Sequence, residues 1–176
     1  MTAPSAASPS TFGYSRALAA PMWVFACIMA VELIVVHLLV SALWSRTAAA
    51  ILSVLSLAAL IGMIAFIRSL KRLPVLVDEE AVTMRLGSLR SVRLPAAQIA
   101  GLRTSWTREE LKGRGVLNLA LINYPNVIID LDPPLARGRG RLRGIAHRLD
   151  DPGAFAAAVG GLIAARDDDG RVRGSD

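Results

Sequence analysis

Two ionisable side chains, Glu32 and His37, lie within a strongly apolar stretch near the start of this 176-residue chain. An ionisable group in such surroundings is costly, and it usually faces protein or a water-filled cavity where it can exchange a proton or an ion. The two residues are about 140° apart around a helix, so they do not share one face as an i,i+4 pair would. They predict either a proton or ion site or a structural pair that hydrogen-bonds to a neighbouring helix. We favour the structural role, because two helices alone cannot enclose a transport pathway.

Basic side chains form a second group that could carry a function. One set alternates with small or apolar residues, so an extended backbone would point its members the same way; it comprises Arg137, Arg139, Arg141 and Arg143. A second set lies beside the amphipathic ring of Trp106 and comprises Arg108, Lys112 and Arg114. A basic residue near an anionic lipid surface contributes about 1 kcal/mol of attraction. We expect both sets to contact lipid headgroups or a protein partner; the competing interpretation is a flexible, solvated loop.

The charge of the whole chain agrees with an anionic partner, since the formal net charge is +6 and the isoelectric point is about 10.6. A basic balance suits either nucleic acid or an anionic membrane surface. The basic segments lack the interleaved aromatic residues on which bases stack. We therefore expect membrane lipids, and not nucleic acid, as the partner of this surface.

Motifs for catalysis are missing from the sequence. It contains no GxxxxGK[ST] loop, no HExxH helix and no paired cysteines, and its single cysteine, Cys27, reads as a small apolar helix residue. We expect His147 at the surface or partly buried in a strand, and Asp130 and Asp132 as solvent-facing carboxylates on one face of a strand. The sequence therefore predicts no enzymatic activity, no cofactor and no metal.

Two apolar runs, residues 21–44 and 47–67, would position the intramembrane polar residues. About 20 apolar residues span a bilayer as a helix, so we predict a transmembrane hairpin over residues 21–68. Trp23 and Trp44 bracket the first helix, where interfacial aromatic residues belong. Basic residues gather on the cytoplasmic side, and the lone Arg46 in the turn is outweighed by Arg16, Arg68, Lys71 and Arg72. Both termini are therefore expected in the cytoplasm.

Folding this hairpin about residue 45 gives a match in depth between the two helices. His37 falls level with about residue 53, and Glu32 level with about residue 58, from the equal rise of both helices. Ser53 and Ser56 lie near these levels and share one helix face. We predict that this face, continued by Ala59, packs on the polar side of the first helix.

The rest of the chain reads as one mainly-β domain with a single helix. Short alternating apolar runs predict seven strands, which are separated by turns at residues 78–80 and 95–98, a charged loop or helical turn at 107–115, a turn at 123–126 and a flexible connector at 135–143. The fifth strand is expected over residues 116–122. Asp151 and Pro152 mark the start of an amphipathic helix, whose buried stripe is Phe155, Val159, Leu162 and Ile163. Gly160 and Gly161 would let it approach a sheet closely. Residues 1–20 and 167–176 are expected to be disordered.

Three segments resemble the bacterial pleckstrin-homology-like membrane proteins: VDEEAVTMRLGSLRSVRLPAAQIAGL with its hairpin and Pro-x-x-x-Ile turn, NVIIDLDPP, and the closing LDDPGAFAAAVGGLI helix. The resemblance covers residues 73–165. Members commonly attach this domain to a pair of transmembrane helices. The resemblance implies a seven-stranded bent barrel with a C-terminal helix over residues 73–166, in a bacterial cell membrane, and it implies no catalytic residues.

These observations predict a membrane protein with a two-helix hairpin followed by a cytoplasmic, mainly-β domain. The expected function is a non-catalytic, membrane-anchored binding or scaffolding module that recruits a protein partner or contacts anionic lipid. The alternative is an accessory subunit of a membrane transport assembly, which would form an oligomer and use Glu32 and His37 at a helix interface or a proton site.

Overall fold

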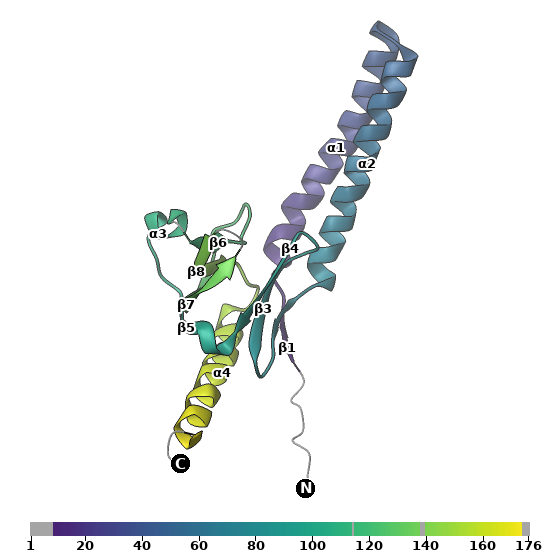
Figure 1. The fold of residues 1–176 in the computed structure, drawn as a ribbon. Helices are drawn as coiled ribbons and strands as arrows, with labels where there is room; N and C mark the ends of the chain where they lie inside the picture. Colours follow the sequence, from purple (N-terminus) through teal and green to yellow (C-terminus); the bar gives the residue numbers. More distant parts are fainter. Residues whose placement is uncertain (1–8, 114, 138–139, 174–176) are drawn as a thin grey trace.

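The computed structural model describes residues 9–113, 115–137 and 140–173, and its fold is a long helical hairpin joined to a small β-rich domain (Figure 1). Helix α1 covers Arg16–Leu43, and helix α2 covers Arg46–Arg72. The hairpin was predicted, but both helices are longer than expected at the end near the domain. Pro21 lies inside α1 near its N-terminal end. Ser45 caps α2 by accepting a hydrogen bond from the Ala48 N–H.

The two helices meet along a seam whose least exposed positions recur every three or four residues. On α1 these positions are Ala26, Met29, Leu33, Val36 and Val40; on α2 they are Ala49, Ser53, Ser56, Leu60, Met63 and Ile67. This alternation keeps one stripe facing a partner helix, as in a coiled coil. The prediction that Ala59 continues the seam is wrong, because the repeat passes to Leu60 and leaves Ala59 exposed.

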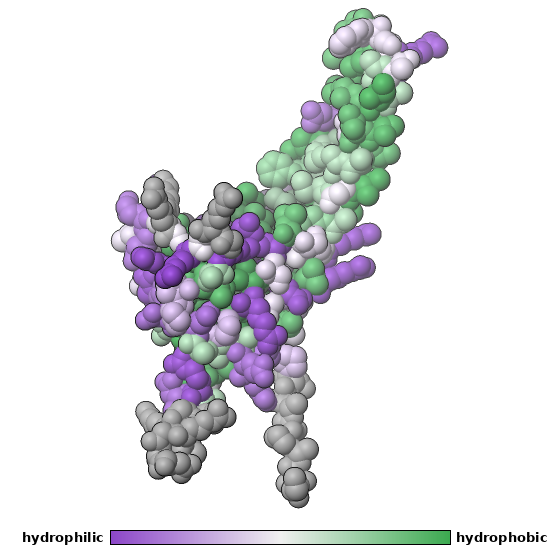
Figure 2. Space-filling model, viewed as in Figure 1, coloured by the Kyte–Doolittle hydropathy of each residue, from purple (hydrophilic) through white to green (hydrophobic). Residues whose placement is uncertain are grey.

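Most other side chains of the hairpin are apolar and exposed. Both helices are long and apolar enough to cross a membrane. Figure 2 shows this apolar surface along the hairpin, while hydrophilic side chains gather on the domain and project at the hairpin's base. An exposed apolar surface of this extent marks a membrane or protein contact.

The domain contains two sheets of four strands each. The first is antiparallel in the order β1 (Ser10–Phe12), β2 (Val75–Val77), β3 (Ala81–Leu86) and β4 (Arg90–Pro95). The second has the order β5 (Ile99–Arg103), β7 (Val127–Arg137), β8 (Gly140–His147) and β6 (Val116–Asn118), with β6 parallel to β8. Short helices η1 (Ala96–Gln98) and α3 (Arg108–Lys112) and the long α4 (Pro152–Arg173) complete it. Within the described residues these strands do not close into the expected seven-stranded barrel.

Several expected boundaries are wrong. Residues 10–12 form an edge strand and 16–20 begin α1, so the described part of the N-terminal segment is ordered; residues 1–8 lie outside the described residues. The expected connector is strand at 135–137 and 140–143, and its remaining two residues are not described. Strand β6 ends at Asn118, because the Asn118 Oδ1 accepts a hydrogen bond from the Ala120 N–H in a local turn. Helix α4 continues through 167–173, where disorder was expected.

The hydrophobic core lies between the sheets and α4 and reaches into the base of the hairpin. Phe155, Val159 and Leu162 are buried as predicted, and Ile163 packs against the core from its edge. The same core includes Leu18 of α1 and Leu70 of α2. The predicted close approach at Gly160 and Gly161 is wrong, since a Cβ at either position would meet no other atom within 4 Å. Hairpin and domain therefore share one core.

Candidate functional site

A buried pair of aromatic rings joins the hairpin to the domain. Tyr14, only 1% exposed, lies 4.8 Å from the ring of His147. The Tyr14 hydroxyl donates to the Leu73 carbonyl at 2.9 Å and accepts from the Gly87 N–H at 2.7 Å. It therefore links the end of α2 to the turn between β3 and β4. Burial raises the pKa of Tyr14, so its hydroxyl keeps its proton.

His147 is fully buried, which corrects the expectation of a surface or partly buried residue. The Arg148 N–H donates to the His147 Nδ1 at 2.8 Å, so Nε2 carries the proton and donates to the Arg85 carbonyl at 2.9 Å. One neutral tautomer satisfies both bonds. Burial lowers the pKa of His147 from 6.5 to about 4. The residue is structural, and it locks β8 to β3.

A third contact stabilises the start of α1. The Ser15 side chain makes no capping bond. Instead, the Asp150 Oδ1, far along the chain, accepts from the Arg16 N–H at 3.2 Å. The Asp150 N–H also donates to the Gly13 carbonyl at 2.9 Å. A carboxylate at a helix N-terminus is stabilising, so the domain itself caps the hairpin. No sequence signal linked Asp150 or Tyr14 to the hairpin.

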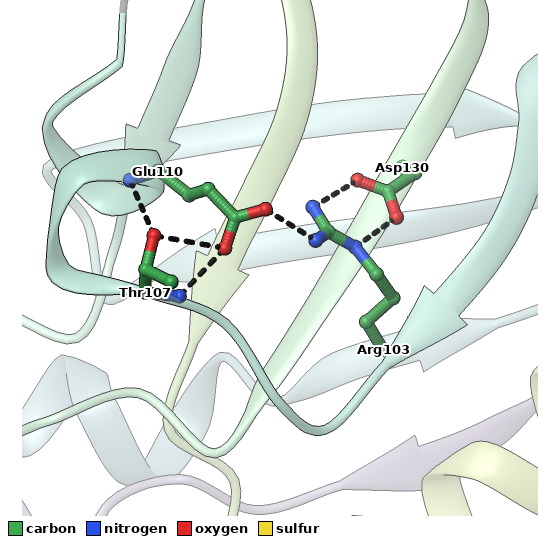
Figure 3. Close-up of polar contacts among 4 residues, drawn as sticks. All are labelled: Arg103, Thr107, Glu110 and Asp130. Carbon is green, nitrogen blue, oxygen red and sulfur yellow. Dashed lines mark hydrogen bonds and ion pairs between the residues drawn. The ribbon is translucent and has the colours of Figure 1, made fainter.

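On the second sheet, a polar network positions α3 (Figure 3). The Arg103 guanidinium holds Asp130 through two bonds, at 2.5 Å from Nε and 2.9 Å from Nη2, and it contacts Glu110 at 3.0 Å from Nη1. Thr107 and Glu110 form a reciprocal capping box at the start of α3. The Thr107 N–H, with Arg103 beside it, lowers the pKa of Glu110. The network neutralises Arg103, whose pKa is raised by Asp130 and Glu110.

This network changes the interpretation of the two carboxylates on β7. Asp130 is not a free, solvent-facing carboxylate, because Arg103 pairs with it. Asp132 is exposed, as expected. Arg103 was missed from the sequence because its partners come from a strand and a helix at different distances along the chain. The TREE segment, with Glu three residues after Thr107, was the one available signal for the capping box.

The predicted basic residues do not form one row. Arg141 and Arg143 are exposed on the outer face of β8. Arg137 lies on the opposite face, because it pairs with Gly140 in the register that also pairs Leu135 with Leu142. Its Nη1 is buried and has no hydrogen-bond partner among the described residues. The two strands turn back between these arginines, so strand alternation cannot align them.

The other predicted contact residues gather around α3. Arg108 begins α3 and is exposed, and Lys112 ends that helix. The Trp106 ring is half-buried and stacks on Tyr124, with ring centroids 6.2 Å apart and planes at 23°. Arg114 and Arg139 lie outside the described residues. Arg108, Arg141 and Arg143 make no ion pair within the described part of the chain, so their charges are available to a partner.

In the hairpin, the predicted match in depth is confirmed for one pair. The His37 Nδ1 and the Ser53 Oγ share a hydrogen bond of 2.7 Å. Ser56 is half-buried on the same seam, three residues nearer the domain along α2. Glu32 is exposed on the other flank of α1, beside Cys27, Ile28 and Val31, and it makes no hydrogen bond or ion pair with any described residue. The structure thus joins His37 to Ser53 and leaves Glu32 apart.

The described residues contain no cluster of three or more His, Cys, Asp or Glu side chains that could hold a metal ion. A scan against protein-family models and searches of curated proteins and of solved structures found no match to this chain.

Proposed function

We propose that this chain is a membrane-anchored binding and scaffolding module without catalytic activity. The observation that supports this most is the core shared by the hairpin and the domain. Tyr14 and Asp150 bind the domain directly to the helix ends. The domain would therefore be held at a fixed height against the bilayer instead of swinging on a linker. The exposed apolar surface of α1 and α2 is the part that the bilayer would cover.

The proposed orientation places both termini and the β-rich domain in the cytoplasm of a bacterial cell. It is supported by the basic residues near the domain end of the hairpin, Arg16, Arg68, Lys71 and Arg72, against Arg46 at the other end. The domain would be pleckstrin-homology-like, which its β-rich architecture and closing helix favour. Reporter fusions to the two termini and to the turn at residues 45–46 test this orientation.

The proposed contact surface is the outer face of β8 together with α3. Its arginines Arg108, Arg141 and Arg143 are exposed, whereas Arg103 nearby is neutralised by carboxylates. Free guanidinium groups bind phosphate and carboxylate groups bidentately. The ligand class is therefore an anionic group, carried by a lipid headgroup or by a protein partner.

The experiment compares the full-length protein with an Arg141→Glu/Arg143→Glu variant. An Arg93→Glu variant, which changes an exposed arginine of the first sheet that is already paired with Asp78, serves as the control. Anionic lipids retained by the purified protein and cross-linked proteins from native membranes are both measured. We expect the double variant to lose one of these ligands and Arg93→Glu to keep it. Equal retention by all three proteins would contradict the proposed surface.

A second candidate function, an accessory subunit of a membrane transport assembly, is favoured by Glu32. This carboxyl group faces outward at mid-depth of α1, where contact with lipid is costly and a neighbouring helix would cover it. The assembly would use Glu32 and His37 at a helix interface or proton site. Cross-linking through the native Cys27, on the same flank, tests this: we expect a dimer or a larger complex that weakens in Glu32→Leu. A monomer in native membranes would exclude this candidate.

A further inference from the structure

Two loops of the domain contact the base of the hairpin, one against each helix, and both expose large apolar side chains. The first is the turn between β3 and β4, residues 87–89. The Ser88 N–H donates to the Ser69 Oγ of α2 at 3.0 Å, and the turn continues into Leu89, which is 67% exposed. Gly87 adopts a positive φ of 48° and packs against α2, so the turn is held firmly in place.

The second loop connects β6 to β7 and lies against α1. Pro21 has no N–H, so the carbonyl of Ala17, four residues earlier, lacks its helical donor. The Asn123 Nδ2 donates to this carbonyl at 3.1 Å. The neighbouring residues of the loop, Leu121, Ile122 and Tyr124, are 44%, 55% and 54% exposed. Figure 1 shows both loops beside the base of the hairpin.

We call the four exposed residues Leu89, Leu121, Ile122 and Tyr124 the collar. Leu121 has a φ of 52°, a left-handed conformation that is unfavourable for a branched side chain in a loop. Tyr124 stacks on Trp106, and tyrosine and tryptophan are the residues enriched at membrane interfaces. Three adjacent or nearly adjacent large apolar side chains on an exposed loop form an apolar patch of the kind that marks a membrane or protein contact.

The position of the collar along the hairpin axis indicates what this patch contacts. A hydrocarbon core of about 30 Å corresponds to about 20 helical residues. Measured from the turn at residues 45–46, the core would end near residue 24 of α1 and residue 66 of α2. Ser69 then lies about 4–5 Å beyond this boundary, inside an interfacial layer about 5–8 Å thick, and Ala17 lies about 10 Å beyond it, just outside that layer. The turn that carries Leu89 is thus placed within the interfacial layer, and the second loop at the outer edge of the headgroups.

We infer that the collar inserts into the interfacial layer of the bilayer that the hairpin spans. The inference rests on the proposed membrane anchoring and adds a second contact, through apolar side chains that do not depend on lipid charge. Burying four such side chains around the hairpin fixes the tilt of the domain as well as its height. The arginines on β8 would then meet their partner at a constant orientation.

The test places a nitroxide label on full-length protein reconstituted in lipid vesicles, with Cys27→Ala as the background. The labels at Leu89→Cys and Ile122→Cys probe the collar. The label at Val54→Cys probes the exposed flank of α2, and the label at Gly160→Cys probes an open position on α4. Accessibility to oxygen and to a water-soluble nickel complex is measured. We expect the collar labels to be less accessible to nickel than position 160 and more accessible than position 54, with Leu89 less accessible than Ile122.

The controls separate the collar from the membrane anchoring itself. Collar labels as accessible to nickel as position 160, with position 54 protected, would overturn the collar alone. A water-accessible position 54 would overturn the anchoring and the collar together. Collar labels that are protected in native membranes but open in vesicles of pure lipid would assign the surface to a protein partner and overturn the lipid assignment.

Discussion

Replacing Tyr14 by phenylalanine removes one hydroxyl group from the joint between the hairpin and the domain. The ring still fills its buried place beside His147, because phenylalanine has the same shape. The Gly87 N–H, which is buried, and the Leu73 carbonyl, which is half-buried, then lose their partner at 2.7 Å and 2.9 Å. A buried polar group left without a hydrogen bond costs about 1–3 kcal/mol. We expect Tyr14→Phe to lower the free energy of unfolding by about 2–3 kcal/mol.

This loss is a large share of a typical domain stability of about 5–15 kcal/mol. The measurement is denaturant unfolding of the full-length protein in detergent micelles, with hydrogen exchange at residues 87–89 as a local readout. Tyr124→Phe is the matched control, because Tyr124 is 54% exposed and its hydroxyl bonds to no described residue. We expect the control to change stability by less than about 0.5 kcal/mol. Equal midpoints for both variants, with unchanged exchange at residues 87–89, would refute the assigned role of Tyr14.

Two further outcomes concern this joint, and a third concerns the network that positions α3. The pKa of His147 falls from 6.5 to about 4 on folding, so below pH 6.5 the unfolded chain binds a proton that the folded chain does not. The contribution of this ring to the free energy of unfolding is therefore fully present above pH 6.5 and decreases toward pH 4. Unfolding measured as a function of pH should show a loss of about 2 kcal/mol in the free energy of unfolding between pH 8 and 5. A free energy that does not change over this range would contradict the burial of the ring. Gly87→Ala places a methyl group against α2 at a φ of 48° and should cost at least about 1–2 kcal/mol in thermal or denaturant unfolding; a neutral effect would mean the turn is not packed there. Asp130→Asn breaks a partly exposed ion pair with Arg103, so we expect the free energy of unfolding to fall by about 1 kcal/mol, and by less in high salt. Asp132→Asn is the control and should leave the free energy of unfolding unchanged. Equal effects of the two variants would argue against the pair.

The hairpin was the feature most open to prediction from sequence. A helix rises by a constant 1.5 Å per residue, so counting from the turn sufficed to place His37 beside Ser53. Ala59 was predicted by continuing the three-residue spacing of Ser53 and Ser56, and that prediction is wrong because the seam alternates spacings of three and four residues. Residues 107–115 were expected to form a charged loop or a single helical turn, and they contain the short helix Arg108–Lys112. Local geometry and local composition are what the sequence expresses directly.

The sequence by itself determined two apolar helices, a β-rich domain with a closing helix, and a basic surface, because these depend on periodicity and composition within short windows. Only the tertiary structure decided which polar residues are buried. Tyr14 became part of the core, His147 lost its solvent, and Asp150 capped a helix that begins far upstream, since each depends on partners from distant segments. The tertiary structure also divided the arginines between two faces of one strand pair. Contacts between distant segments set burial, and burial sets both hydrogen-bond requirements and pKa values.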